Sequence, residues 1–146
     1  MTTYSLDTNV IISHLREDRF VKETDRFFQQ VIEKEDKLVM PDVVYAELYA
    51  GIYLSENPKS EEARVQSFLA VNNIEVRASR SLKVAKRAGQ LYSAYLKRRG
   101  VAIRRILPDS LIAAQAEVTS KAFVTWNKLD YKNLGLKIPV LSPEET

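Results

Sequence analysis

The chain has 146 residues, of which 45% are hydrophobic and 28% charged, and its formal net charge is +3. These values predict one globular domain, over residues 1–146, that buries a core of its own. The chain has no cysteine, which excludes disulfides, a thiolate metal site and a cysteine nucleophile. Its first residues lack the pattern of a signal peptide, and no segment approaches the roughly 18 apolar residues of a membrane span. We therefore expect a cytoplasmic protein with no membrane partner.

Apolar runs alternate with stripes of helical periodicity along the chain. The runs predict short strands at residues 3–6, 37–40, 74–76, 122–124 and 138–141. Between the strands, the periodicity predicts a helix that opens at residues 10–12 and a helix with an apolar stripe of Phe27, Phe28, Val31 and Ile32. It also predicts a helix after Pro41, one after Ser60, one across residues 84–95 and one after Pro108. Strands that alternate with helices indicate an α/β protein. We expect a three-layer α/β/α fold with a short, mostly parallel central sheet of four to five strands.

Two aspartates stand where a carboxylate has either a structural or a functional role. Asp7 directly follows the first predicted strand, and Asp109 opens the helix after Pro108. Both positions suit a helix N-cap, for which aspartate is among the preferred residues. Asp109 also falls on the apolar face of its helix, because Ile112 and Ala116 lie three and seven residues further on. A carboxylate that edges toward the core favours a functional role over a cap.

Glu47 is the acid that is hardest to explain structurally. On the helix after Pro41, it shares a predicted face with the apolar residues Val43, Val44, Gly51 and Leu54. We therefore expect a buried carboxylate in an apolar stripe, which is costly unless an arginine or a metal ion compensates it. No arginine in the sequence is obviously placed to do so, although an ion pair stays open.

A fourth polar cluster, at residues 125–131, follows the strand at 122–124, and its structural alternative is a capped loop that starts a short helix. All four clusters follow strand candidates or begin about one turn beyond one, so we expect them at one edge of the sheet. Like charges there would repel one another and resist ionising. A divalent cation resolves the conflict, and oxygen ligands without cysteine favour Mg²⁺ or Mn²⁺ over Zn²⁺. A divalent cation held by carboxylates activates water for phosphodiester hydrolysis, so the four clusters favour this reaction.

Four segments together resemble the PIN-domain family. They are residues 6–12 (LDTNVII), 46–51 (AELYAG), 108–114 (PDSLIAA) and 125–131 (TWNKLDY). Each segment alone occurs by chance, but the four in this order are specific, and their spacing is similar to that of the VapC branch. The resemblance covers nearly the whole chain.

The resemblance implies a Mg²⁺- or Mn²⁺-dependent endoribonuclease that cleaves RNA and acts as the toxin of a toxin–antitoxin pair. It also implies a homodimer and a small antitoxin protein as the partner that neutralises it. Two alternatives stay open. One is a PIN-domain nuclease for housekeeping RNA processing or DNA cleavage without an antitoxin, and the other is a catalytically silent dimerisation module.

The resemblance further assigns residue roles. It makes Asp7, Glu47 and Asp109 the metal-binding and catalytic acids, with Thr8 and Asn9 shaping the first turn and Thr125 in the last motif. Many relatives carry an aspartate at the position of Asn127. Here the nearest acid is Asp130, which we count with the catalytic and metal-binding residues, and whether it or Asn127 completes the site stays open.

Basic residues concentrate between residues 77 and 105. We expect Arg98, Arg99, Arg104 and Arg105 to bind the phosphate backbone of the substrate. The alternative is a solvated helix end whose cations complement the helix dipole. Trp126, beside the last acid cluster, is expected either to stack on a base or to anchor its loop in the apolar core.

Overall fold

The computed structural model describes residues 1–78, 81–99, 106–132 and 134–146. Its centre is a five-stranded, all-parallel sheet with the strand order β3-β2-β1-β4-β5. The strands are β1 (Thr3–Leu6), β2 (Lys37–Pro41), β3 (Ile74–Arg77), β4 (Ala122–Val124) and β5 (Val140–Leu141). The prediction of a mostly parallel sheet of four to five strands is confirmed.

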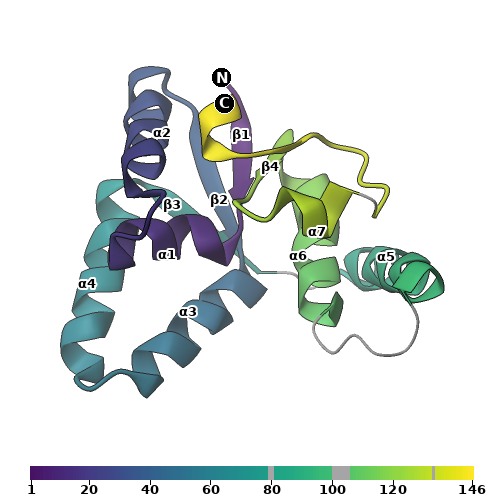
Figure 1. Ribbon diagram of the computed structural model, residues 1–146, viewed down its shortest axis with the longest axis horizontal. Helices are drawn as coiled ribbons and strands as arrows, with labels where there is room; N and C mark the ends of the chain where they lie inside the picture. The colour runs from purple at the N-terminus through teal and green to yellow at the C-terminus, as the bar shows by residue number, and fades with distance from the viewer. Residues whose placement is uncertain (79–80, 100–105, 133) are drawn as a thin grey trace.

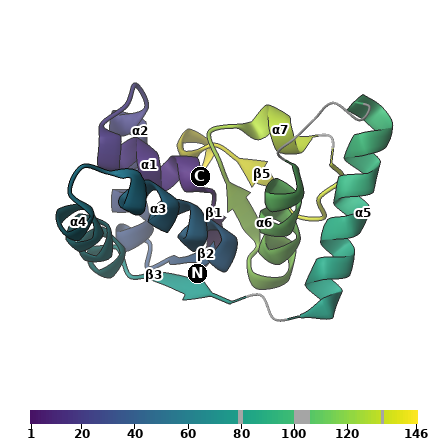
Figure 2. The same cartoon turned by 90° about the horizontal axis from the view of Figure 1, so that it is seen from below.

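Helices cover both faces of the sheet, as Figures 1 and 2 show. One side carries α1 (Thr8–Arg16), α2 (Val21–Glu33) and α4 (Pro58–Val71). The other side carries α5 (Leu82–Arg99) and α6 (Ile106–Thr119). The remaining helical segments are α3 (Asp42–Leu54), which contacts both α1 and α6, α7 (Lys128–Lys132) and the 3₁₀ turn η1 (Pro143–Glu145). The three-layer α/β/α prediction is therefore confirmed, and no helix in the described ranges is both long and apolar enough for a bilayer.

The two faces of the sheet are packed by side chains of different size. On the side of α2, the Phe27 ring meets Tyr4 of β1 edge-on, with the ring centroids 5.9 Å apart. On the side of α6, the fully buried Ala113, Ala114 and Ala116 allow the helix to lie close to the strands. The small residues of α6 thus bring Asp109, in its first turn, near the edge of the sheet.

Helix boundaries differ from the sequence prediction at prolines. The helix predicted after Ser60 begins earlier, at Pro58, because Asn57 caps α4 by accepting the Ser60 N–H (3.1 Å) and Pro58 occupies the first turn. Similarly, α6 begins at Ile106, so Pro108 lies inside its first turn, where no intrahelical N–H is needed. Ile32, expected in the apolar stripe of α2, is 58% exposed, because only Phe27, Phe28 and Val31 of that stripe reach the core.

The chain reverses its direction of travel across the sheet at β1. From β1 it moves to β2 and β3 on one side, whereas β4 and β5 lie on the other side. At the carboxyl ends of the two central strands, Leu6 is in register with Val124, and the Asp7 N–H donates to the Val124 carbonyl (3.0 Å). In open parallel sheets, ligands bind in the crevice at such a switch point. This topology places the crevice at Asp7 and Thr125.

Candidate active site

Asp7 is the N-cap of α1, as the structural interpretation of the sequence allowed. Its backbone is extended, and its Oδ1 accepts the N–H of the half-buried Thr8 at 2.8 Å. The residue is nevertheless only 6% exposed, which is far more burial than a surface cap requires. Capping therefore explains one oxygen of Asp7 and leaves the other to be explained.

The second oxygen, Oδ2, accepts three hydrogen bonds from other elements. The donors are Thr125 Oγ1 at 2.9 Å, Tyr131 OH at 3.2 Å and Asn9 Nδ2 at 3.3 Å. Thr125 and Tyr131 are buried, and Asn9 additionally donates to Thr125 Oγ1 (3.1 Å). The structure thus brings the predicted supporting residues Asn9 and Thr125 into direct contact with Asp7, and it adds Tyr131.

Tyr131 was not singled out from the sequence. Its ring packs edge-on against Phe123, with centroids 4.8 Å apart, as the ring of an ordinary core residue would. The available signal was its hydroxyl, because a buried tyrosine needs a hydrogen-bond partner. Burial, and then the charge of Asp7, raise the pKa of Tyr131, which keeps the hydroxyl protonated as a donor to Asp7.

Burial has the largest effect on the pKa of Asp7 itself. Desolvation raises the pKa of this carboxyl, while the hydrogen bonds from Thr125, Thr8 and Tyr131 lower it and the charge of Asp130 raises it. The hydrogen bonds therefore offset part of the cost of burying the charge. They also fix the orientation of the carboxylate, as donors around a metal ligand do.

Asp109 is half-buried in the first turn of α6 and feels the other acids strongly. Desolvation, followed by the charges of Asp7, Glu47 and Asp130, raises its pKa to about 7. Tyr131 lowers this pKa by hydrogen bonding. The predicted acids therefore converge electrostatically, although Asp109 arrives from a helix that follows α5 and not from the end of a strand.

Glu47 does not lie in a buried apolar stripe, and that prediction is wrong. The buried face of α3 consists of Val44, Leu48 and Ile52, and Glu47 lies beside that face with its side chain exposed. Partial desolvation, followed by the charge of Asp7, still raises the pKa of Glu47, and the Thr8 hydroxyl lowers it. Glu47 thus belongs to the acid cluster through its electrostatic interaction with Asp7, and burial is not what marks it.

Asn127 and Asp130, the two residues that were candidates to complete the site, contribute to it in different ways. Asn127 is exposed, and its backbone N–H donates to Thr125 Oγ1 at 3.0 Å. Asp130 is also exposed, in the first turn of α7, and its charge raises the pKa of both Asp7 and Asp109. Between the two, Asp130 is the residue that acts on the other acids, while Asn127 contributes its backbone to the turn.

The donor set fits a hard divalent cation. All candidate ligands are carboxylate oxygens, and the acids raise one another's pKa, which an added positive charge would relieve. Asp7 Oδ1 accepts one hydrogen bond, from the Thr8 N–H, and keeps a lone pair, and the Ser110 hydroxyl beside Asp109 is buried without a partner among the described atoms. Within the described ranges, no three acid or histidine side chains form a ready-made cage.

The predicted substrate-binding arginines cannot be placed. Arg104 and Arg105 lie outside the described residues, as do the side chains of Arg98 and Arg99 at the end of α5. Two other cations of the basic segment have structural partners. Arg77 pairs with Glu75, and Arg87 pairs with Glu117 at 2.7 Å, joining α5 to α6.

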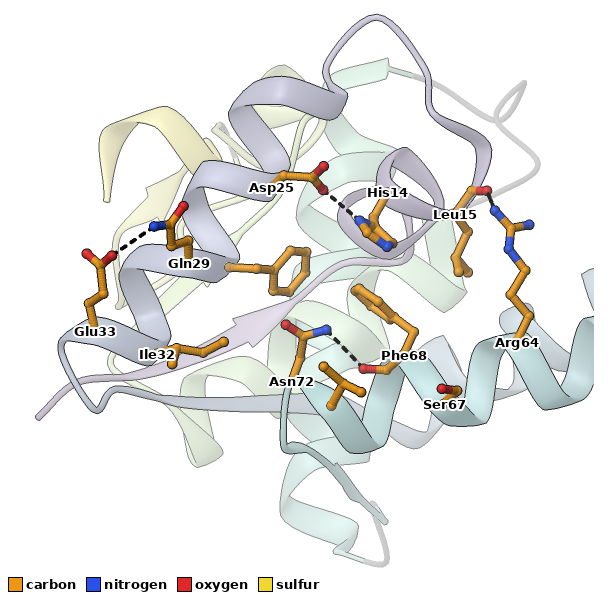
Figure 3. Close-up of a pocket in the computed structure, with 12 residues that line it drawn as sticks. His14, Leu15, Asp25, Gln29, Ile32, Glu33, Arg64, Ser67, Phe68 and Asn72 are labelled. Atoms are coloured by element: carbon orange, nitrogen blue, oxygen red, sulfur yellow. Dashed lines mark hydrogen bonds and ion pairs between the residues drawn. The ribbon is translucent and has the colours of Figure 1, made fainter.

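A large cavity lies away from the acids, between α1, α2 and α4 (Figure 3). It encloses about 640 Å³ and contains His14, whose ring stacks on Phe68 with centroids 4.5 Å apart. His14 Nδ1 lies 2.6 Å from Asp25 Oδ1. The single histidine of the chain is thus engaged in packing and an ion pair, apart from the acid cluster.

The fold and the site define an α/β protein with a cluster of interacting acids at the switch point of a parallel sheet. The model of the PIN domain family matches residues 4–132, which is most of the chain. The chain therefore belongs to the PIN domain family, a family of nucleases. No curated protein matches the chain significantly.

Solved structures share this fold over nearly their full length. The chain aligns with VapBC2 from Rickettsia felis, bound to a DNA fragment from its promoter, at TM-score 0.76 and 21% identity, covering 96% of this chain and 98% of that one. For VapBC-1 from nontypeable Haemophilus influenzae, the TM-score is 0.74 and the identity 21%, and the alignment covers 97% of this chain and 98% of that one. For FitAcB from Neisseria gonorrhoeae, the TM-score is 0.67 and the identity 25%, and the alignment covers 98% of this chain and 99% of that one.

The Tyr131 hydroxyl provides a test of the hydrogen bonding around Asp7. Tyr131→Phe removes one donor and keeps the ring contact with Phe123, so we expect a folded protein in which the pKa of Asp7 rises further. Carboxyl ¹³C NMR across a pH titration measures this pKa. Tyr53→Phe, at a 72% exposed residue, is the control and should leave it unchanged. An unchanged Asp7 pKa in Tyr131→Phe would show that the hydroxyl does not stabilise the carboxylate.

The raised pKa of Asp109 makes stability depend on pH. Because the folded carboxyl holds its proton up to about pH 7 and the unfolded one only to 3.8, stability falls as pH rises through this window. We expect urea unfolding in EDTA to show a loss of about 1–3 kcal/mol after solvent screening. Asp109→Asn should flatten the dependence, leaving the smaller contributions of Asp7 and Glu47. If the free energy of unfolding depended on pH equally in the wild type and in Asp109→Asn, Asp109 would not be the source of the dependence.

Proposed function

We propose that this protein is a metal-dependent endoribonuclease and the toxin of a toxin–antitoxin pair. The observation that carries the nuclease proposal is the electrostatic convergence of Asp7, Glu47 and Asp109 at the switch point of a PIN-domain sheet. Carboxylates that mutually resist ionisation create a demand for a divalent cation. Their donor chemistry suits Mg²⁺ or Mn²⁺.

In this proposal Asp7 and Asp109 hold the ion, and Glu47 and Asp130 complete the acidic surroundings directly or through water. When bound, the ion polarises the scissile phosphate and lowers the pKa of water. Thr125, Tyr131 and Asn9 orient Asp7 by donating to Oδ2, and the hydrogen bonds from Thr125 and Tyr131 offset part of the rise in its pKa caused by burial. Their contacts leave Oδ1, which accepts the Thr8 N–H, as the Asp7 oxygen that would be available to hold the ion.

RNA as substrate and an antitoxin as partner extend the proposal beyond the family. The solved structures with this fold include the complexes named VapBC and FitAcB, and this likeness supports a small antitoxin protein as the partner. A homodimer, as expected from the resemblance to the VapC branch, stays a prediction. Housekeeping RNA processing is the alternative role for the same active site.

Loss of either central acid tests the nuclease proposal. We expect Asp7→Asn and Asp109→Asn each to reduce Mg²⁺-dependent cleavage of total RNA by about 10³-fold or more, because each removes a charge that holds the cation. Primer extension on the cleaved RNA identifies the sites and measures the rate. Glu56→Gln, at an exposed acid outside the cluster, is the matched control and should retain full activity. Full activity of Asp7→Asn would exclude Asp7 as a metal ligand.

The toxin role has a separate test. Induced expression of the wild-type chain should arrest growth, and Asp109→Asn should relieve the arrest because cleavage is lost. Co-expression of the small open reading frame adjacent to the gene should also relieve it, with complex formation measured by co-purification. RNA cleavage without growth arrest, and without an adjacent partner, would favour the housekeeping role over the toxin role.

A further inference from the structure

Three planar groups stack on one another close to the acids. The Phe20 ring lies parallel to the Trp126 indole, with centroids 4.3 Å apart and an interplanar angle of 11°. On Phe20 also lies the Arg19 guanidinium, with its carbon 4.7 Å from the ring centroid. Arg19 is exposed, whereas Phe20 and Trp126 are half-buried. We call Arg19, Phe20 and Trp126 the aromatic ladder.

The ladder is attached directly to the contacts of Asp7. The backbone N–H of Trp126 donates to Asn9 Oδ1 at 3.0 Å, and Nδ2 of the same Asn9 amide donates to Asp7 Oδ2. Thr125, the neighbour of Trp126, donates to the same Asp7 oxygen. The ladder therefore begins one residue from a side chain that touches the central carboxylate.

A buried chain of hydrogen bonds fixes the ladder in place. Trp126 Nε1 donates to Thr24 Oγ1 (3.0 Å), Thr24 and Ser13 hydroxyls are 2.8 Å apart, and Ser13 Oγ donates to Asp18 Oδ1 (2.7 Å). An indole N–H only donates and a carboxylate only accepts, so Thr24 must donate to Ser13. The same Asp18 oxygen accepts the Phe20 N–H (2.9 Å). Both aromatic rings of the ladder are thus tied to one carboxylate.

The charge of Arg19 is available to a ligand. Arg19 forms no ion pair with any residue in the described ranges, although the neighbouring site contains several acids. A guanidinium stacked on a ring keeps its N–H edge free, and its planar donors match a phosphate group. Contact with the Phe20 ring, which is itself held by Trp126, restricts the Arg19 side chain before any ligand binds, and this reduces the entropy lost on binding.

We propose that the aromatic ladder is a subsite for single-stranded RNA, in which the Arg19 guanidinium binds a backbone phosphate of the strand that enters the acid site. The ladder connects this cation to the residues that contact Asp7, and a cation there would offset the repulsion between the acids and the RNA strand. This inference rests on the proposed ribonuclease function, and it names a residue that the motif resemblance does not include.

Binding without cleavage tests the subsite. In an Asp109→Asn background, which leaves the contacts of Asp7 and Trp126 intact, anisotropy of a labelled single-stranded RNA of about 12 nucleotides reports affinity across a KCl series. Adding Arg19→Gln should lower the slope of log affinity against log salt by about 0.7, the value for one phosphate contact on a single strand. The same slope corresponds to about fivefold weaker binding near 0.1 M salt.

Matched variants separate a phosphate contact from general charge and from packing. Arg26→Gln makes the same charge change at an exposed residue of α2 and should leave slope and affinity unchanged. Arg19→Lys keeps the charge without the planar fork, so it should retain the salt slope and lose part of the affinity. Trp126 is the single tryptophan of the chain, so its fluorescence should change when unlabelled RNA binds.

The outcomes distinguish the subsite from the proposed function. If Arg19→Gln and Arg26→Gln give equal slopes while the wild-type chain cleaves RNA, the ladder is only a structural anchor and the inference is overturned. If the Asp109→Asn chain binds no RNA and the wild type cleaves none, the ribonuclease proposal fails as well. Unchanged melting temperature in Arg19→Gln is expected, because the exposed guanidinium contributes little to the core.

Discussion

The burial of one carboxylate, that of Asp7, organises the active end of this molecule. A charged group with 6% exposure is stable only if the surrounding structure supplies donors. Here they come from the first turn of α1, from the residue after β4 and from α7. Hydrogen bonds to a charged group contribute about 1.5–3 kcal/mol each, so the position of α7 and the turn after β4 is coupled to the charge of this single residue.

The neighbouring acids are not satisfied in the same way. Desolvation, followed by the charges of neighbouring acids, raises the pKa values of Asp109 and Glu47, and fewer hydrogen-bond donors offset it than at Asp7. A protein selected only for stability would not retain three such acids within electrostatic reach of one another. Functional sites are where a fold departs from the arrangement that would stabilise it most. The contrast between Asp7, with several hydrogen-bond donors, and its neighbours, with few, marks the candidate active site without reference to any relative.

Local patterns in the sequence predicted the elements well and their mutual placement less well. Each strand is a short apolar run, so all five were found, but their order around β1 depends on long-range packing. Helical periodicity identified the apolar residues of α3 and misjudged its buried face. Val44, Leu48 and Ile52 are buried while Leu54 is 88% exposed, and Glu47 falls at the boundary. Tyr131 was missed because its partner Asp7 is 124 residues away, beyond any local pattern.

That separation along the chain has a consequence during synthesis. The partners of Asp7 at Thr125 and Tyr131 are 118 and 124 residues downstream of it, so all of the intervening chain must be translated before the carboxylate can be enclosed. Strand β4, which pairs with β1, is also translated late. A nascent chain that lacks β4 and α7 therefore cannot enclose Asp7. The topology thus delays assembly of the acid cluster until these two elements have been translated.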